Sequence, residues 1–222
     1  MDKKILSFDL DDTLYEEKQF VLSGYKAVSK HIGLISCCNE KIIYDIMVDI
    51  FNTEGREDLF NKVLELQGIN TNYEVKNCLK IYRGHTPKIY LNKGLRKKLN
   101  KYKNESYLVT DGNRFVQRNK IKALNIENSF KKIFITRDYG VKNEKPSLKV
   151  FKIISKMEKI DLSSIVYIGD NPAKDFVNLN KHGALTIQVG NKTLSYGKEY
   201  NSKLKFRNII SAIEFLESRK II

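Results

Sequence analysis

The sequence predicts an α/β protein in which a helical segment interrupts a parallel sheet after its first strand. Two observations indicate this. Short apolar runs alternate with amphipathic segments from about residue 88 onward, which is typical of a parallel sheet covered by helices on both faces. Residues 18–83, by contrast, show apolar residues at helical spacing throughout and no strand pattern.

The predicted elements follow in order along the chain. Residues 4–9 form an apolar run that ends in acidic residues, as a buried strand does at its carboxyl end. The helical segment carries four apolar stripes, which begin at Val21, Ile42, Leu59 and Val75. The remaining strands are expected at 106–110, 132–136, 165–169 and, as the last one, 184–189. Helices are expected at 92–101, 114–124, 147–158, 173–181 and 208–219.

This order predicts two domains. Residues 1–15 and 88–222 would form the core that contains the sheet, and residues 16–87 would form a small all-helical cap. Two crossings, near residues 14–17 and 84–88, would allow the cap to hinge over the strand ends. Ligands bind at that edge of α/β sheets.

Composition excludes several classes of protein. Hydrophobic residues make up 41% of the 222 residues and charged residues 30%, so the chain is neither disordered nor a membrane protein. Three cysteines without a CxxC motif give no disulfide framework and no zinc site. The apolar run at the start is cut by Asp9, too early for a signal peptide. We therefore expect a cytoplasmic protein without a membrane partner.

The net charge of +14 raises the question of nucleic acid binding. Only eight of the forty basic residues are Arg, and the basic residues are scattered along the chain rather than grouped in an arm or tail. Recognition of phosphates and bases favours the guanidinium fork of Arg. A Lys-rich surface is therefore the preferred interpretation, with steering of an anionic substrate second and no nucleic acid partner expected.

Four short motifs carry chemically active side chains. Three of them directly follow a predicted strand, and the fourth lies just before a predicted helix. They are Asp9-Leu10-Asp11-Asp12-Thr13, Thr110-Asp111-Gly112-Asn113, Lys145-Pro146, and Gly169-Asp170 with Asp175 behind it. Three acids within four residues crowd negative charge, which favours a compensating cation, and oxygen ligands suit Mg²⁺. Thr110 and the turn amides after it suit phosphate oxygens, and Lys145 suits a phosphoryl group. Each motif alone is weak, but their joint order is specific.

The four motifs resemble those of the haloacid dehalogenase superfamily of phosphohydrolases, over the whole chain and including the helical first-position cap. The opening of the sequence and the segment Thr110–Asn113 are similar to the corresponding segments of one subgroup, the pyrimidine 5′-nucleotidases and acylneuraminate-9-phosphatases. The resemblance implies a Rossmann-like core and a Mg²⁺-dependent phosphatase that forms an aspartyl-phosphate. The implied substrate is a small soluble phosphate ester, either a nucleoside monophosphate or a sugar phosphate.

The resemblance also implies a role for each matching residue. Asp9 would be the nucleophile and Asp11 the general acid and base. Mg²⁺ would be held by Asp9, Asp170 and the backbone carbonyl of Asp11. Thr110 and the amide of Asp111 would bind phosphate, Lys145 would balance its charge, and Asp175 would orient Lys145 or a metal-bound water. Candidate substrate contacts are Asn113 and, at the second crossing, Arg83 and His85.

Other activities that use similar residues are alternatives to a phosphatase. A carboxylate at position 11 favours phosphoryl transfer over carbon–halogen hydrolysis. A signalling receiver also has acids, a Thr and a Lys on a parallel sheet, but in a different order along the chain. A phosphomutase would use the same aspartyl-phosphate and return the phosphate to a second substrate hydroxyl. A protein that binds a phosphate ester or nucleic acid without turnover is the remaining alternative.

Overall fold

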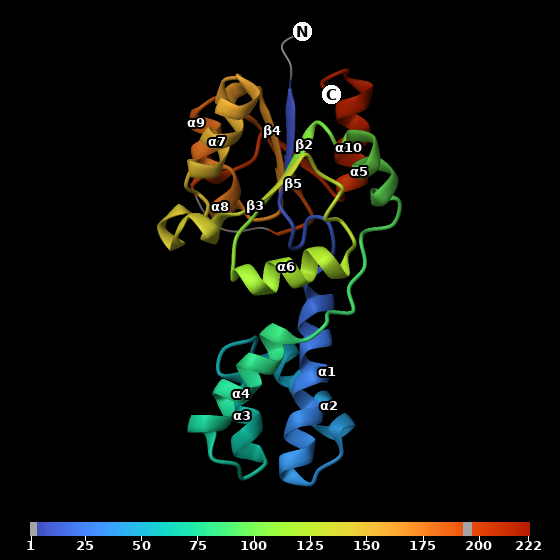
Figure 1. Ribbon diagram of the computed structural model, residues 1–222, viewed down its shortest axis with the longest axis vertical. Helices are drawn as coiled ribbons and strands as arrows, with labels where there is room; N and C mark the ends of the chain where they lie inside the picture. Colours follow the sequence, from blue (N-terminus) through green and yellow to red (C-terminus); the bar gives the residue numbers. More distant parts are fainter. Residues whose placement is uncertain (1–3, 193–196) are drawn as a thin grey trace. The chain divides into compact units, whose positions relative to one another are not determined.

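The computed structural model describes residues 4–192 and 197–222 (Figure 1). The chain divides into two compact units. One joins the residues up to Glu17 with Tyr90–Ile222, and the other is Lys18–Ile89. Both crossings therefore lie two residues later than the boundaries expected from the sequence. No helix among the described residues is long and apolar enough to cross a membrane.

The first unit is built on a parallel six-stranded sheet with the strand order β3-β2-β1-β4-β5-β6. β1 lies near the centre and pairs Leu6 with Ser106 of β2 and Ile5 with Ile165 of β4. The predicted sheet class is thereby confirmed. The strands are β1 Ile5–Phe8, β2 Ser106–Thr110, β3 Lys132–Ile135, β4 Ile165–Gly169, β5 Leu185–Val189 and β6 Leu204–Phe206.

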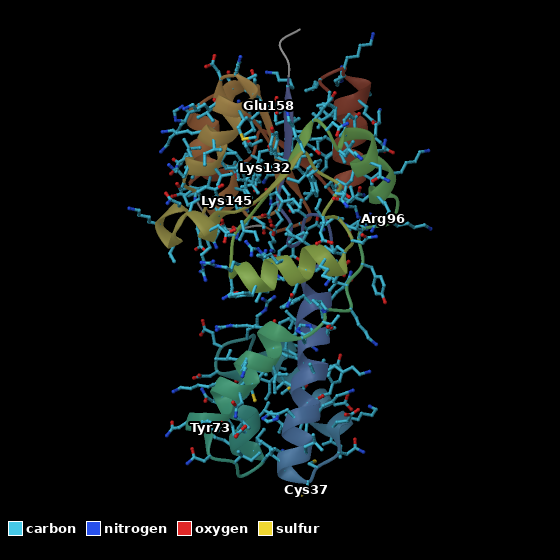
Figure 2. All side chains as sticks on the ribbon, viewed as in Figure 1. Cys37, Tyr73, Arg96, Lys132, Lys145 and Glu158 are labelled. Atoms are coloured by element: carbon cyan, nitrogen blue, oxygen red, sulfur yellow. The ribbon has the colours of Figure 1, made fainter. Side chains whose placement is uncertain are left out.

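Helices cover both faces of this sheet, as predicted. Figure 1 shows α7 and α9 on one side and α5 and α10 on the other. Arg96, labelled in Figure 2, donates to the backbone carbonyls of Leu124 and Asn125 and so ties α5 to the end of α6. The helices are α5 Leu95–Tyr102, α6 Arg114–Ala123, α7 Lys149–Glu158, α8 Pro172–Asp175, α9 Val177–Lys181 and α10 Ile209–Ser218.

The central strands are apolar because both of their faces are buried. All four residues of β1 and all five of β2 and of β4 are buried, which is why these segments appear as continuous apolar runs rather than as alternating ones. On one face, Ile5, Val109 and Phe134 pack with Phe151 and Ile154 of α7. This core fixes the strand ends at which the four sequence motifs lie.

The strand predicted at 184–189 is present as β5, but its place as the last strand was wrong, and so was the continuity of one helix. The strand at 184–189 is not the last, because β6 follows it at the edge of the sheet, paired with β5 through Ile187 and Leu204. Three residues with an exposed lysine in the middle are too short for an alternating pattern to be detected. The helix expected at 173–181 is divided at Phe176, which has a φ of −116° and separates α8 from α9. The Phe176 ring is fully buried.

The remaining boundaries shift by a few residues. Thr136 does not extend β3 but begins a short 3₁₀ turn, Thr136–Tyr139. α5 begins at Leu95 rather than 92, because Gly94 precedes it with a φ of +79°, a left-handed conformation that glycine adopts without a Cβ clash. α7 begins at Lys149, two residues later than expected.

The second unit consists of four helices: α1 Glu17–Ser36, α2 Glu40–Thr53, α3 Leu59–Leu66 and α4 Thr71–Gly84. Their apolar stripes form a separate core that includes Val21, Ile32, Ile43 and Val63. Gly33 lies inside α1, where it allows close packing: a Cβ there would come within 2.8 Å of the carbonyl oxygen of Cys38.

Ile42, which begins the second predicted stripe, and Leu66, which was expected to end the third, are exposed. Ile42 is 53% exposed and Leu66 is 66% exposed, whereas Leu64, which the stripe omitted, is fully buried. Both exposed residues lie near a helix end, at the start of α2 and at the end of α3. Apolar spacing alone does not show where along a helix the packed face ends.

Candidate active site

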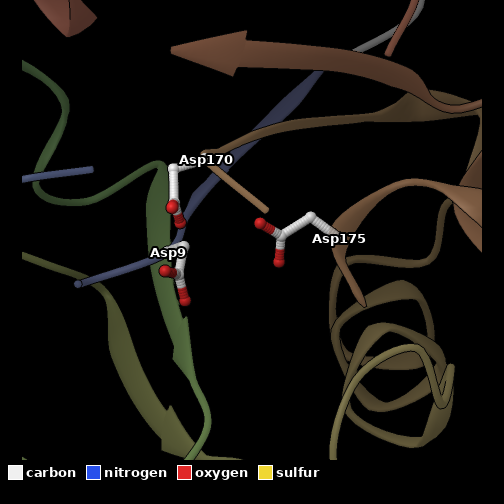
Figure 3. A group of neighbouring side chains, drawn as sticks. All are labelled: Asp9, Asp170 and Asp175. Atoms are coloured by element: carbon white, nitrogen blue, oxygen red, sulfur yellow. The ribbon is translucent and has the colours of Figure 1, made fainter. Parts of the chain in front are cut away.

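Three buried carboxylates meet at the carboxyl ends of β1 and β4 (Figure 3). Asp9 follows β1 directly, Asp170 follows β4, and Asp175 ends α8. One oxygen of each lies within 4.8 Å of the others, and the three residues are only 2–7% exposed. The backbone N–H of Asp9 donates to the carbonyl of Ile168 at 2.9 Å, which continues the β1–β4 pairing into the site.

The ammonium of Lys145 lies among these acids. Its Nζ is 2.5 Å from Asp9 Oδ1 and 2.7 Å from Asp175 Oδ1, and it also donates to the hydroxyl of Tyr167 at 2.8 Å. Lys145 is 6% exposed. Burial alone would lower the pKa of Lys145, but the carboxylates of Asp175 and Asp9 raise it well above its usual range. The side chain is therefore a fixed positive charge.

A single buried ammonium does not neutralise the group. Burial raises the pKa of Asp9 well above its usual range, against the opposing effect of Lys145. Burial also raises the pKa of Asp170 to about 6, although Lys192 donates to that carboxylate from a half-exposed position. Three carboxylates held this closely favour a further cation, which would keep them ionised.

The donor set fits Mg²⁺. Hard divalent cations take oxygen ligands, and at the usual Mg–O distance opposite ligands lie about 4 Å apart, close to the spacing of these acids. Asp175 already accepts three hydrogen bonds, from Lys145 and the Tyr167 hydroxyl on Oδ1 and from the backbone N–H of Asn171 on Oδ2. Asp9 and Asp170 are thus better suited to hold the ion than Asp175 is.

Asp11 lies beside this group and has a different environment. Its Oδ1 accepts from Lys120 Nζ at 2.7 Å and from the Tyr15 hydroxyl at 2.5 Å, and its Oδ2 accepts from Gln117 Nε2 at 2.9 Å. Burial would raise the pKa of Asp11, but Lys120 and the three hydrogen bonds outweigh burial and lower it. The structure therefore separates two carboxylates that are two residues apart in sequence.

Thr110 and Asp111 occupy the end of β2. Thr110 is buried, and its Oγ1 accepts from Gln117 Nε2 at 2.6 Å. Oδ1 of Asp111 accepts from the Thr136 hydroxyl at 2.6 Å and from the backbone N–H of Lys145 at 3.0 Å. Asp111 thereby fixes the start of the segment that delivers Lys145 to the site.

One cavity of about 260 Å³ in the first unit is lined by residues of all these groups, including Asp9, Asp11, Thr110, Lys145 and Asp170. Charged side chains dominate its walls, and Arg137 and Lys174 extend the positive charge at its edge. Arg137 is paired with Glu144, with its Nε 2.7 Å from the carboxylate. Because eight acidic and four basic side chains line the cavity, a small anionic molecule would need a cation beside it to bind there.

The sequence-predicted substrate residues lie in different places. The carboxamide oxygen of Asn113 accepts from the backbone N–H groups of Phe115 and Val116, so Asn113 acts as the N-cap of α6. Arg83 and His85 belong to the second unit. Nδ1 of His85 lies 2.7 Å from the Tyr82 carbonyl, and the His85 ring packs against Phe20.

The site also contains residues that the motifs did not identify as members of it: Tyr15, Gln117, Lys120, Tyr167 and Lys192. Gln117 and Lys120 gave one signal in the sequence. They share a helix face with Ile121 and Leu124, the spacing of a buried stripe, although they are polar. Polar residues within such a stripe need buried partners, so the pattern indicates a polar site beneath the helix.

Comparison with known proteins agrees with this geometry. Residues 6–189 match the family model described as haloacid dehalogenase-like hydrolase. A glyceraldehyde 3-phosphate phosphatase of Methanocaldococcus jannaschii is 31% identical over 201 residues, covering 84% of each chain. The enzyme of the same name from Pyrococcus furiosus is 26% identical over 212 residues, covering 92% of this chain and 85% of that one.

A solved structure shares the whole fold. The HAD hydrolase YfnB of Bacillus subtilis, described as bound to magnesium, superposes with a TM-score of 0.67 at 15% identity, covering 97% of this chain and 99% of that one. The sheet order, the order of the four motifs and the family match all agree. The chain belongs to the haloacid dehalogenase-like hydrolases.

Proposed function

We propose that this protein hydrolyses a small phosphate monoester, with Asp9 as the nucleophile and Mg²⁺ as the cofactor. The observation that carries the proposal is the grouping of Asp9, Asp170 and Lys145 in one cavity beside Asp11. The relatives named as phosphatases support it.

In the first half of the reaction, a carboxylate oxygen of Asp9 attacks phosphorus and the ester P–O bond breaks. Asp11 gives its proton to the departing alkoxide. Thr110 donates to a phosphate oxygen, and Lys145 balances the negative charge shared by the nucleophile and the phosphoryl group. The product of this half is an aspartyl-phosphate at Asp9 and the free alcohol.

In the second half, Asp11, now ionised, takes a proton from water. The oxygen of that water attacks phosphorus, the bond between phosphorus and Asp9 breaks, and inorganic phosphate leaves. The negative phosphate ester beside Asp11 opposes the effect of Lys120 and raises the pKa of Asp11 from its lowered value, so that Asp11 holds a proton at the start of the cycle and regains it at the end. Its position beside Asp9, on a short turn after β1, allows one carboxyl group to serve both halves.

The ion would be held by the carboxylates of Asp9 and Asp170 together with the backbone carbonyl of Asp11. When bound, Mg²⁺ supplies positive charge to the phosphate oxygens and keeps both carboxylates ionised. Asp175 does not need to be a ligand in this arrangement, because it holds Lys145 in place from the opposite side.

Sugar phosphates are the preferred substrate class, since both named relatives act on a three-carbon sugar phosphate by their names. We propose that Lys18–Ile89 acts as a cap that selects the leaving group, with Arg83 and His85 as its candidate contacts. Nucleoside monophosphates remain in the test as the second class.

The test is phosphate release in the presence of Mg²⁺ from a panel of triose, pentose and hexose phosphates and nucleoside monophosphates. Asp9→Asn is measured beside the wild type. We expect strong turnover of a few sugar phosphates, loss of at least about a thousandfold in Asp9→Asn, and loss on chelation that added Mg²⁺ restores.

Three results would overturn parts of the proposal separately. Retained activity in Asp9→Asn would remove the nucleophile assignment. Full activity after exhaustive chelation would remove the metal. A wild type inactive on the panel and also on p-nitrophenyl phosphate would remove the hydrolase assignment for this site.

A further inference from the structure

Helix α6 presents two polar side chains to the interior of the first unit. Gln117 and Lys120 are 2% and 3% exposed, although they lie on a surface helix whose neighbouring residues Arg114 and Arg118 are exposed. Residues three apart share one helix face. Side chains of these types are seldom buried, and their burial is unfavourable without hydrogen-bond partners. Both have partners in the active site.

The amide of Gln117 connects two functional groups. Its Nε2 lies 2.9 Å from Asp11 Oδ2 and 2.6 Å from Thr110 Oγ1. An amide nitrogen carries two hydrogens, so each acceptor receives one. A flipped amide would place its carbonyl oxygen against the Asp11 carboxylate, which excludes that orientation. Because the Thr110 oxygen accepts from Gln117, its own hydrogen, which makes only a 3.5 Å hydrogen bond to the backbone carbonyl of Asp111, is the one that would donate to a phosphate oxygen.

Lys120 fixes the other oxygen of the same carboxylate. Among the residues that the structure describes, Oδ1 of Asp11 accepts from both Lys120 and Tyr15, whereas Oδ2 accepts from Gln117 alone. A carboxylate offers about two lone pairs on each oxygen. The remaining acceptor position is therefore on Oδ2, and that is the oxygen suited to carry the transferred proton.

We infer that Gln117 and Lys120 are positioning residues for the phosphatase reaction. Together they orient the Asp11 carboxyl so that Oδ2 faces the leaving group, and Gln117 also orients the Thr110 hydroxyl toward the phosphate. Gln117 acts on both acid–base chemistry and phosphate binding, whereas Lys120 acts on the first alone. The inference rests on the proposed function and assigns roles within it.

The test compares Gln117→Leu and Lys120→Met on two esters. One is the best sugar phosphate, whose alkoxide must be protonated as it leaves; the other is p-nitrophenyl phosphate, whose phenolate scarcely needs a proton. Each variant is also made in the Asp11→Asn background. Lys122→Met, an exposed lysine of the same helix, is the matched control. Calorimetry with inorganic phosphate and Mg²⁺ measures phosphate binding without turnover.

We expect both variants to slow alcohol release in the first turnover, followed by rapid quench, about 10- to 100-fold for the sugar phosphate and less than about 3-fold for p-nitrophenyl phosphate. The first turnover is the measure because the second half-reaction uses Asp11 with either ester. Once Asp11 is Asn, Lys120→Met should not slow this step further, and Gln117→Leu should do so only through its effect on phosphate binding. Gln117→Leu alone should also weaken phosphate binding about 3- to 10-fold, through the Thr110 hydroxyl. Gln117→Glu, which keeps the shape but directs an acceptor at Asp11, should lose at least as much activity as Gln117→Leu.

Equal losses of the first-turnover rate on both esters, or a further loss from Lys120→Met in the Asp11→Asn background, would show a merely structural role and overturn the inference. Equal phosphate affinities in the two single variants would overturn the dual role of Gln117. Thermal melts identify any variant that fails to fold. If Gln117→Leu is such a variant, the activity of Gln117→Glu tests the positioning role in its place. An inactive wild type would count against the proposed function, whereas an active wild type with unaffected variants would count against this inference alone.

Discussion

Two aspartates that lie two positions apart, Asp9 and Asp11, end in opposite electrostatic environments. Asp9 faces two other carboxylates and one ammonium, and burial raises its pKa. Asp11 faces an ammonium, a phenol and an amide, which together lower its pKa despite burial. The turn after β1 directs one side chain toward β4 and the other toward α6. This separation agrees with the two different roles proposed for them, a nucleophile and an acid–base group.

The substitution Asp11→Asn tests that division of roles. We expect it to lower kcat for a sugar phosphate about 10²- to 10⁴-fold, because no acid then protonates the alkoxide. Turnover of p-nitrophenyl phosphate should fall less in the first half-reaction, and a burst of nitrophenol should precede slow phosphate release. Rapid-quench measurement on both esters provides the check. Equal loss on both esters with no burst would contradict the acid–base role.

At this scale the sequence predicted the acids and Lys145 but not their partners. Asp9, Asp11, Thr110, Lys145 and Asp170 stand out because each follows an apolar strand or precedes a helix. The partner residues Tyr15 and Lys192 have no such marker, and Gln117 has only its place in an otherwise apolar helix face. Whether a glutamine on a helix faces solvent or a carboxylate depends on how that helix is rotated against the sheet, and side-chain spacing alone leaves this open.

The end of β4 is the element on which the geometry depends most closely. Gly169 is the last residue of this strand, and a Cβ there would lie 2.4 Å from Asp175 Oδ2. Asp175 in turn holds Lys145. Gly169 therefore permits the close approach of α8 to the strand.

We expect Gly169→Ala to displace Asp175 and to lower kcat at least about tenfold, because Lys145 loses one of its two carboxylate partners. The comparison is Gly84→Ala, where an added Cβ meets nothing within 4 Å. Steady-state kinetics on p-nitrophenyl phosphate and thermal melts of both variants are the measurements. Wild-type kinetics in Gly169→Ala would show that the position of Asp175 does not matter.

A second element-level feature lies on α10. Glu217 accepts from Lys98 at 2.6 Å, from Lys101 at 2.8 Å and from the Tyr102 hydroxyl at 2.8 Å, joining α10 to α5. These hydrogen bonds, those from Lys101 and Lys98 foremost, lower the pKa of Glu217 to about 2.

Since the pKa is lower in the folded than in the unfolded chain, Glu217 stabilises the fold above about pH 4.5. This contribution disappears as the pH falls toward 2. We expect Glu217→Gln to cost about 1–2 kcal/mol at pH 7 and to have a smaller effect at each step below pH 4.5. Urea unfolding from pH 7 to pH 3 measures the difference. Glu214→Gln, an exposed residue of the same helix, is the control; a cost independent of pH would contradict the interpretation.

Among the elements, long and strongly patterned ones were predicted well and short ones poorly. β1, β2 and β4 were found because burial on both faces makes them continuously apolar. β6 was missed because three residues at a sheet edge carry almost no pattern, and its pairing with β5 depends on the chain between them. The break at Phe176 was missed because a buried aromatic residue fits equally well in a continuous helix.

For the whole molecule, the notable feature is that each unit has its own apolar core. Ile32 is fully buried in the second unit and Ile154 in the first. We expect Ile32→Ala and Ile154→Ala each to cost about 2–5 kcal/mol. Hydrogen exchange should show faster opening of α1–α4 in Ile32→Ala and of the sheet in Ile154→Ala. Uniform acceleration over the whole chain in both variants would show that the two cores unfold as one.

The strand order has a consequence for how the protein is made. β1 precedes the other strands in the chain, yet its hydrogen-bonded neighbours are β2 and β4. A ribosome adds about 5–20 residues per second, so β1 waits roughly 8–30 s before β4 has been synthesised. During that interval β2 and Lys145 are already made, whereas Asp170 and Asp175 follow only after β4. The nascent chain therefore completes the acidic group of the candidate site last, and its first strand spends the wait with one of its two neighbours rather than both.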